Sequence, residues 1–226
     1  KNMDALKKSR PEFYDTFLDA YNKKTSEKQS SIEVLEAKDG TSIFSVVKDG
    51  QRIRLNSLYR PKQEAEQWAA KFEQNNILVN AMLFGLGNGL FAEALIARLK
   101  DDATIYIYEP SMDLFVCALQ NVDLSGIICN HRVHLYVQGI NQDEFFPDIR
   151  KNTHWTNLET QIYCHHTAFD MLFPNEYDDF LFAIRKTYQI VQVNKDTAAY
   201  FSKKMVANMI DNLVYLRDSR YICLLY

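Results

Sequence analysis

The chain has 226 residues, 47% of them hydrophobic and 24% charged, which is the composition of an ordinary globular protein. Its 26 basic and 29 acidic residues give a net charge of −3, so no overall positive field attracts a nucleic-acid backbone or an anionic membrane surface. No stretch has the roughly 18 consecutive apolar residues that a membrane span needs, and the N-terminal segment lacks the apolar core of a secretory signal. We therefore expect a cytoplasmic protein that binds neither nucleic acid nor membranes.

The N-terminal part predicts a helix, a small antiparallel sheet and a second helix. Apolar residues at helical spacing predict the first helix over 12–21. The pairs Asp39-Gly40 and Asp49-Gly50 separate segments rich in β-branched residues, which predicts tight turns joining three antiparallel strands within 32–57. Pro61 suits the first turn of the helix that follows.

The middle of the chain alternates strands with helices. Such alternation predicts a parallel sheet with helices on its faces. The expected strands cover 79–84, 104–108, 133–137 and 160–163, and the expected helices cover 90–100 and 112–120, the second capped by Ser111. From Asn175 to Arg217 the pattern is helical, and the polar residues near Asn194 predict a break between two helices.

The fold class predicted from these elements is α/β. We expect a Rossmann-like parallel sheet with flanking helices, preceded by a small antiparallel β-meander and followed by a helical region. The predicted division of the chain is an N-terminal helix, meander and linking helix over 1–75, the Rossmann-like domain over 76–174, and a helical connector over 175–226.

A glycine-rich loop lies between the first expected strand of the parallel sheet and the helix after it. Gly85, Gly87 and Gly89 permit positive φ and let a ligand approach the backbone, and a helix N-terminus offers free N–H groups to an anion. Glu109 ends the next strand, where an acid is placed to accept hydrogen bonds from ribose hydroxyls. These three glycines and Glu109 are the candidate cofactor-binding residues.

The glycine spacing separates the classes of ligand. A dinucleotide fingerprint would need its third glycine where Leu90 stands, and the lysine of a phosphate-binding Walker loop is absent. The pattern GxGxG is similar to the first motif of class I methyltransferases, which bind S-adenosylmethionine. Gln138 replaces the acid these enzymes often have after the third strand, and Cys164-His165-His166 replaces their amino-group motif, so no catalytic residue is assigned. S-adenosylmethionine and a nucleotide both stay open as ligands, and so does a loop retained only for packing.

Two groups of histidine and cysteine residues contain the residue types that bind metal ions. Cys129, His131 and His134 form one group, but the two histidines of a strand separated by three positions face opposite sides. His165 and His166 follow Cys164 near the carboxyl end of an expected strand, where open α/β sheets bind their ligands. We predict no metal site and regard His165 and His166 as candidate pocket residues.

Two stretches carry a family resemblance. The segment LNSLYRPKQEAEQW resembles the one that precedes the nucleotide-fold domain of bacterial motility accessory factors. The segment LFGLGNGLFAEALIARLKDDATIYIYEPSMDLFVCAL is similar to that domain's glycine loop, helix, second strand and Glu-Pro turn. The matching residues are Ser57, Tyr59, Pro61, Glu64, Ala65, Gly85, Gly87, Glu109 and Pro110.

The resemblance implies a role in flagellin glycosylation, in which members of this family transfer nonulosonic acids such as pseudaminic acid. Their transferase centre lies in a following domain with a Gly-Pro-Ser-Leu motif, which does not occur in this sequence. The resemblance therefore implies a non-catalytic N-terminal region whose helical end leads to a further domain, with flagellin as a partner of the full-length protein. Two alternatives stay open: an S-adenosylmethionine-dependent class I methyltransferase, and a scaffold domain with a vestigial glycine loop.

Overall fold

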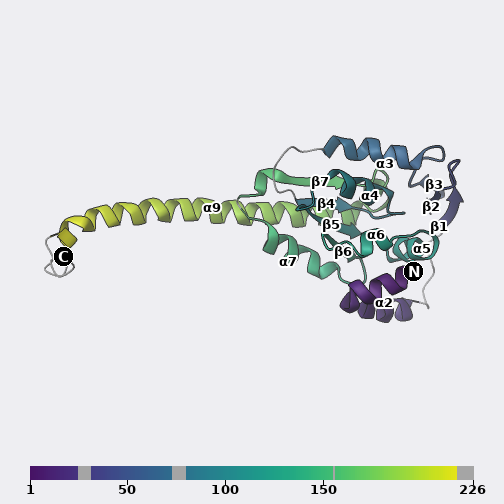
Figure 1. Ribbon diagram of the computed structural model, residues 1–226, viewed down its shortest axis with the longest axis horizontal. Helices are drawn as coiled ribbons and strands as arrows, with labels where there is room; N and C mark the ends of the chain where they lie inside the picture. The colour runs from purple at the N-terminus through teal and green to yellow at the C-terminus, as the bar shows by residue number, and fades with distance from the viewer. Residues whose placement is uncertain (25–31, 73–79, 155, 218–226) are drawn as a thin grey trace.

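The structure is a computed structural model that describes residues 1–24, 32–72, 80–154 and 156–217 (Figure 1). The first elements are α1 (Asn2–Ser9), α2 (Pro11–Lys24), β1 (Ile32–Glu36), β2 (Ser42–Lys48), β3 (Gln51–Arg54), α3 (Pro61–Ala69) and the 3₁₀ turn η1 (Ala70–Phe72). Next come β4 (Asn80–Phe84), α4 (Leu90–Arg98), β5 (Thr104–Glu109), α5 (Met112–Asn121), α6 (Ser125–Ile128), β6 (Val133–Val137), α7 (Gln142–Asn152), the 3₁₀ turn η2 (Leu158–Thr160), β7 (Gln161–His165) and α8 (Phe169–Leu172). The last element is α9 (Pro174–Arg217).

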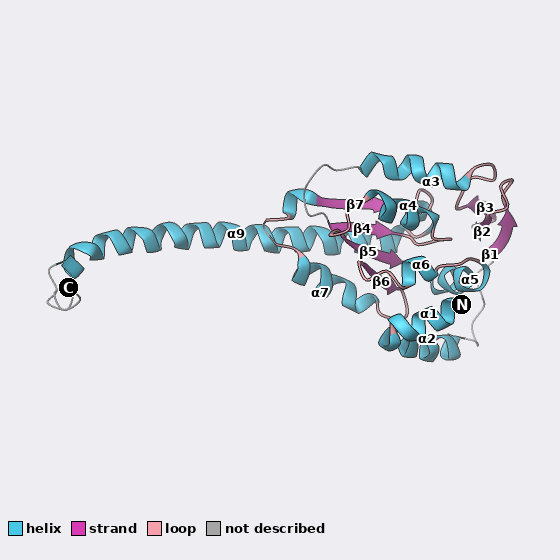
Figure 2. Ribbon diagram, in the orientation of Figure 1, coloured by secondary structure: helices cyan, strands magenta, loops and turns pink. Residues whose placement is uncertain are grey.

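The predicted parallel sheet is confirmed. Its strands have the order β6-β5-β4-β7, and every neighbouring pair is parallel (Figure 2). In the central strand, Ala81 pairs with Ile105 on one side and with Ile162 on the other, and all three are buried. Such strands are apolar on both faces because helices cover both faces of a parallel sheet.

The predicted antiparallel meander is confirmed as a separate sheet of order β1-β2-β3. Its second turn has φ values of 51° at Asp49 and 76° at Gly50, the pair of positive angles that a tight type I′ hairpin needs. The meander lies at the carboxyl edge of the parallel sheet (Figure 2). The side-chain amide of Asn88 in the glycine loop donates to the carbonyl of Ser42 at 3.0 Å, which fixes this position.

Aromatic contacts join the helices to the parallel sheet. From α9, the ring of Phe180 packs 5.2 Å from that of Phe84 in β4. The Trp68 ring of α3 lies 4.9 Å from the Phe91 ring of α4. The buried side chains of the N-terminal part, the parallel sheet and the first half of α9 belong to one continuous hydrophobic core. The division at residues 75 and 174 stays a prediction.

The predicted break near Asn194 is wrong, because α9 runs as one helix of 44 residues. The residues from 175 to 217 include neither glycine nor proline. Asn, Asp and Thr cost a helix interior only about 0.7 kcal/mol each or less, so polar residues alone do not end a helix. The short helices α1, α6 and α8 were not predicted.

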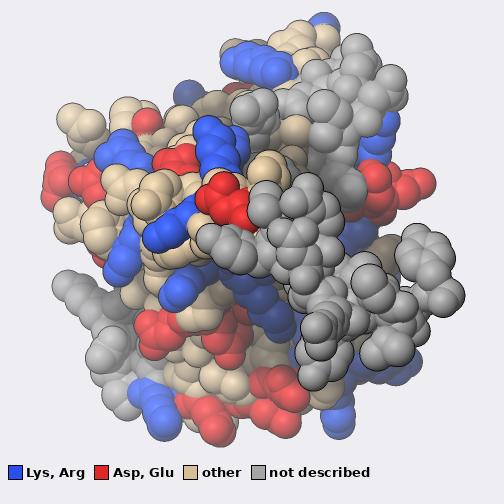
Figure 3. All heavy atoms as spheres, turned by 90° about the vertical axis from the view of Figure 1, so that its left-hand side faces the viewer, with Lys and Arg blue, Asp and Glu red and all other residues tan. Residues whose placement is uncertain are grey.

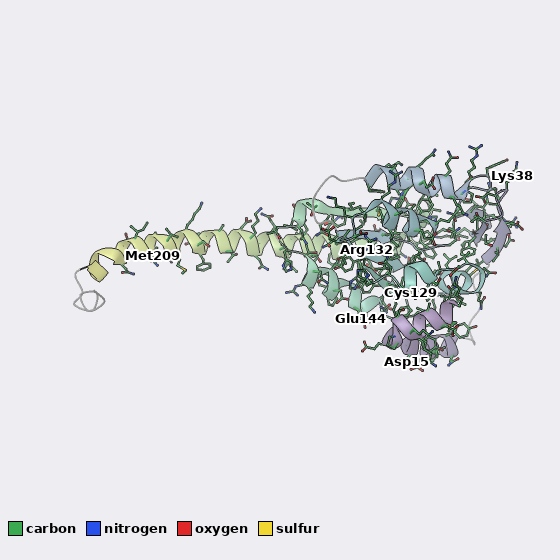
Figure 4. All side chains as sticks on the ribbon, in the orientation of Figure 1. Asp15, Lys38, Cys129, Arg132, Glu144 and Met209 are labelled. Carbon is green, nitrogen blue, oxygen red and sulfur yellow. The ribbon has the colours of Figure 1, made fainter. Side chains whose placement is uncertain are left out.

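The second half of α9 extends away from the rest of the protein (Figure 1). In its first half Ile184 and Val191 are buried, whereas Met205 and Met209 farther along are 75% and 58% exposed. Figure 4 shows Met209 on this extended part. The apolar pattern of α9 therefore continues beyond the body against which its first half packs.

The surface has no dominant charge on the face seen end-on along α9. Basic and acidic side chains lie interspersed there (Figure 3), in keeping with a net charge of −3. Of the helices that the structure describes, none combines the length and apolarity needed to span a membrane.

Candidate functional site

The glycine loop connects β4 to α4, as the sequence predicts, and is buried along its whole length. Gly85, Gly87 and Gly89 have φ values of 95°, 56° and 86°, which L-amino acids with side chains rarely adopt. The loop therefore needs glycine for its backbone conformation, whether or not a ligand binds.

Glu109 accepts hydrogen bonds from the loop. Its Oε2 atom accepts from the backbone N–H groups of Leu86 and Gly87 at 2.8 and 3.0 Å, and its Oε1 atom accepts from the N–H of Ser111 at 3.0 Å. The side chain is 0% exposed, and this burial raises its pKa to about 7, although the three N–H groups act in the opposite direction. The carboxylate thus accepts hydrogen bonds from the N–H groups that would otherwise be free to bind an anionic ligand.

Ring side chains close the space over the glycines. A Cβ atom at Gly85 would lie 2.6 Å from the ring of Phe169, and one at Gly87 would lie 3.4 Å from Nε2 of His166. Aliphatic side chains close the far end, where a Cβ at Gly89 would lie 2.7 Å from Leu124. Ligand binding at the loop would require the backbone at Gly87 to be open to solvent. In this structure the backbone there is buried.

His166 is a buried histidine without a polar contact. Its ring lies 4.3 Å from Phe91 and 4.9 Å from Phe169, and neither ring nitrogen has a hydrogen-bond partner among the described residues. Burial lowers its pKa to about 3, so the ring is neutral at physiological pH. Its neighbour His165 is partly exposed, with Nδ1 3.2 Å from the hydroxyl of Tyr177. The sequence predicted both as pocket residues, but His166 instead fills the space over the loop.

The structure therefore brings Gly85, Gly87, Gly89 and Glu109 together, as predicted. Glu109 bonds to the loop itself, and side chains cover the glycines, so these residues do not line an open cleft. Cofactor binding by these four residues stays a prediction. Sequence reasoning missed Phe169, because an aromatic residue four positions after a strand carries no signal that distinguishes a lid from ordinary core packing.

The other candidate stretch, before and within α3, builds the entry to that helix. Ser57 Oγ accepts from the N–H of Tyr59 at 3.2 Å, and Glu64 Oε2 accepts from the N–H of Ser57 at 2.8 Å. Pro61 opens α3, and Ala65 is buried in the core. These contacts tie the segment before α3 to the first turns of the helix. Tyr59 remains 63% exposed.

The cysteine and histidine groups do not converge. Cys129 and His131 are exposed, whereas His134 stacks on Tyr106 with ring centroids 5.0 Å apart. Within the described ranges, no three His, Cys, Asp or Glu side chains are placed to hold a metal ion.

Comparisons with known proteins give little further information. No protein-family model matches the chain, and no curated protein matches it. Among solved structures, it is similar to one described as "crystal structure of putative transferase PH0793 from Pyrococcus horikoshii", with 17% sequence identity and a TM-score of 0.27. The match covers 46% of this chain and 38% of that one, so the chain spans well under half the length of this relative. A likeness at this level assigns no function.

Proposed function

We propose that this chain is a non-catalytic N-terminal region of a glycosyltransferase similar to the motility accessory factors, in which the Rossmann-like sheet is a scaffold. The observation that carries the scaffold role is the hydrogen bonding of Glu109 to Leu86 and Gly87 beneath the rings of His166 and Phe169. A loop whose N–H groups are satisfied from within needs no cofactor to be stable. The assignment to this family rests on the two resembling stretches, and flagellin is the partner it implies for the full-length protein.

The buried loop distinguishes this proposal from the methyltransferase alternative. A methyltransferase must hold S-adenosylmethionine against the glycine loop, with the acid after the second strand free to meet the ribose. Here Glu109 is committed to backbone groups of its own chain. Calorimetric titration with S-adenosylmethionine and S-adenosylhomocysteine tests the difference. We expect no heat of binding at millimolar concentration, and saturable binding of either compound would favour the methyltransferase.

The role in glycosylation needs a test in cells. In a flagellated bacterium that carries the gene, deleting the segment that encodes this chain should remove the sugar mass from flagellin, as measured by intact-protein mass spectrometry. Complementation with Glu109→Gln should restore that mass if the variant folds, because the proposal gives Glu109 no catalytic role. Unchanged flagellin mass after the deletion would contradict the proposed role.

A further inference from the structure

A solvent-open hollow of about 510 Å³ lies between α3 and the segment that follows β7. Its volume is within the range of small-molecule sites. The side chain of Trp68, part of the hydrophobic core, is one of the residues that line it. The polar residues around it are Ser57, Tyr59, Arg60, Gln63, Glu64, Gln67, Lys71 and Thr167. The glycine loop does not line this hollow.

The hollow adjoins the carboxyl end of β7, an edge strand of the parallel sheet. In the order β6-β5-β4-β7, the chain starts at β4, proceeds to one side through β5 and β6, and then adds β7 on the other side. The sheet therefore changes direction between β4 and β7, and ligands bind outside the carboxyl ends of the strands at such a point. Thr167 stands two residues beyond the end of β7, and the other described lining residues lie within 57–71, so the hollow borders this edge on the β7 side.

The hollow is lined by a row of hydrogen-bond donors. Arg60, Gln63, Gln67 and Lys71 recur at intervals of three or four residues and so lie along one side of α3 and its 3₁₀ extension. No carboxylate of the described residues pairs with Arg60 or Lys71. The lining also contains one carboxylate, Glu64, which accepts the N–H of Ser57. With Arg60 and Lys71 against Glu64, the described lining has one more cationic than anionic side chain to offer an anionic ligand.

An exposed aromatic ring stands beside the first of these cations. Tyr59 is 63% exposed and precedes Arg60 in the chain. The ammonium of Lys38, at the meander end of the protein in Figure 4, lies 4.3 Å from the centroid of the Tyr59 ring. An aromatic ring can stack on a base while an arginine contacts a phosphate. Because Lys38 lies over one face of the Tyr59 ring, a base would stack on the other face.

We infer that this hollow binds a nucleoside phosphate, with the phosphates on Arg60 and Lys71 and the base on Tyr59. The inference goes beyond the scaffold role, because it places a ligand outside the closed glycine loop. Different results would overturn the scaffold role and this inference. Binding of S-adenosylmethionine at the glycine loop would contradict the scaffold role, whereas absence of nucleotide binding beside α3 would contradict the inference.

The experiment is a calorimetric titration of the full chain with ADP, with adenosine and inorganic pyrophosphate as separate arms. We expect ADP to bind and to quench the fluorescence of Trp68, pyrophosphate to bind more weakly, and adenosine to bind weakest. Arg60→Ala and Lys71→Ala should each raise the Kd for ADP about tenfold, the scale for losing a charged hydrogen bond. Tyr59→Ala should weaken the binding of ADP but not the binding of pyrophosphate.

The matched control is Lys62→Ala, which removes one exposed lysine of the same helix outside the lining of the hollow. It should leave the Kd unchanged. The inference is overturned if ADP does not bind at millimolar concentration or if adenosine binds as tightly as ADP. It is also overturned if Lys62→Ala raises the Kd for ADP as much as Lys71→Ala does.

Discussion

The carboxylate of Glu109 lies 3.0 Å from the backbone nitrogen of Gly87 and accepts its hydrogen bond. An acid at the end of the second strand and a glycine of the loop after the first are the two groups that would face a ligand from opposite sides in a nucleotide-binding sheet. Here they bind each other. The glycine loop and the acid are therefore close together, and their hydrogen bonds are made to each other.

Glu109 should make stability depend on pH. Burial raises its pKa to about 7 from an ordinary value of 4.5. Its contribution to stability is therefore complete below the unfolded pKa and is lost as the pH rises through about 7, a change of about 3 kcal/mol. Glu109→Gln cannot titrate. Urea denaturation at pH 5 and pH 8 should show the wild type losing stability relative to this variant, and parallel pH profiles of the two proteins would contradict the assignment.

Gly85→Ala should destabilise the protein strongly. Its φ of 95° disfavours alanine, and the new Cβ would lie 2.6 Å from the Phe169 ring. Together these effects should cost about 2–4 kcal/mol. Gly126→Ala is the matched control, because a Cβ there meets nothing within 4 Å and the residue is helical. It should change stability by less than about 1 kcal/mol. Similar melting temperatures for the two variants would show that Phe169 does not cover the loop.

Asn2→Ala should weaken the attachment of the first helix to the domain and so lower the stability of the protein. The side-chain amide of Asn2 donates to the carbonyls of Leu119 and Val122, and its oxygen accepts from the N–H of Leu124. Removing these bonds leaves buried groups unpaired, at a cost of about 2 kcal/mol. Thermal denaturation measures the loss. Ser9→Ala, on an exposed residue of the same helix, should leave the melting temperature nearly unchanged.

The two halves of α9 should respond differently to the same kind of truncation. Ile184→Ala removes a buried side chain and should cost about 2–4 kcal/mol. Met209→Ala removes a side chain that is 58% exposed and should change stability by no more than about 0.5 kcal/mol. Equal losses would mean that the extended half of α9 is covered in solution.

The fold was predictable where local patterns decide it. The Asp49-Gly50 turn fixes a hairpin by its own backbone preferences, and the short apolar strands separated by helices indicate a parallel sheet. The break predicted near Asn194 was wrong because weak helix formers do not end a helix that lacks glycine and proline. The helix α1 was missed because its main anchor, Asn2, bonds to groups 117 to 122 residues away.

The sequence predicted which residues of the candidate site lie together. It did not predict whether Glu109 faces a ligand or the N–H groups of the loop. The order of strand, glycine loop and acid places Glu109 beside Gly87, whatever the loop binds. Whether the acid faces a ligand or the loop N–H groups depends on what covers the loop. That cover comes from His166 and Phe169, whose positions are set by long-range packing on Phe91 and Phe84.

The most direct test of the closed loop is an amide NMR titration of the full chain with S-adenosylmethionine. We predict that the resonances of Leu86 and Gly87 keep their positions at millimolar ligand, and that both amides exchange slowly with solvent because they donate to Glu109. Saturable shifts at these two amides, or fast exchange of both in the free protein, would contradict the account.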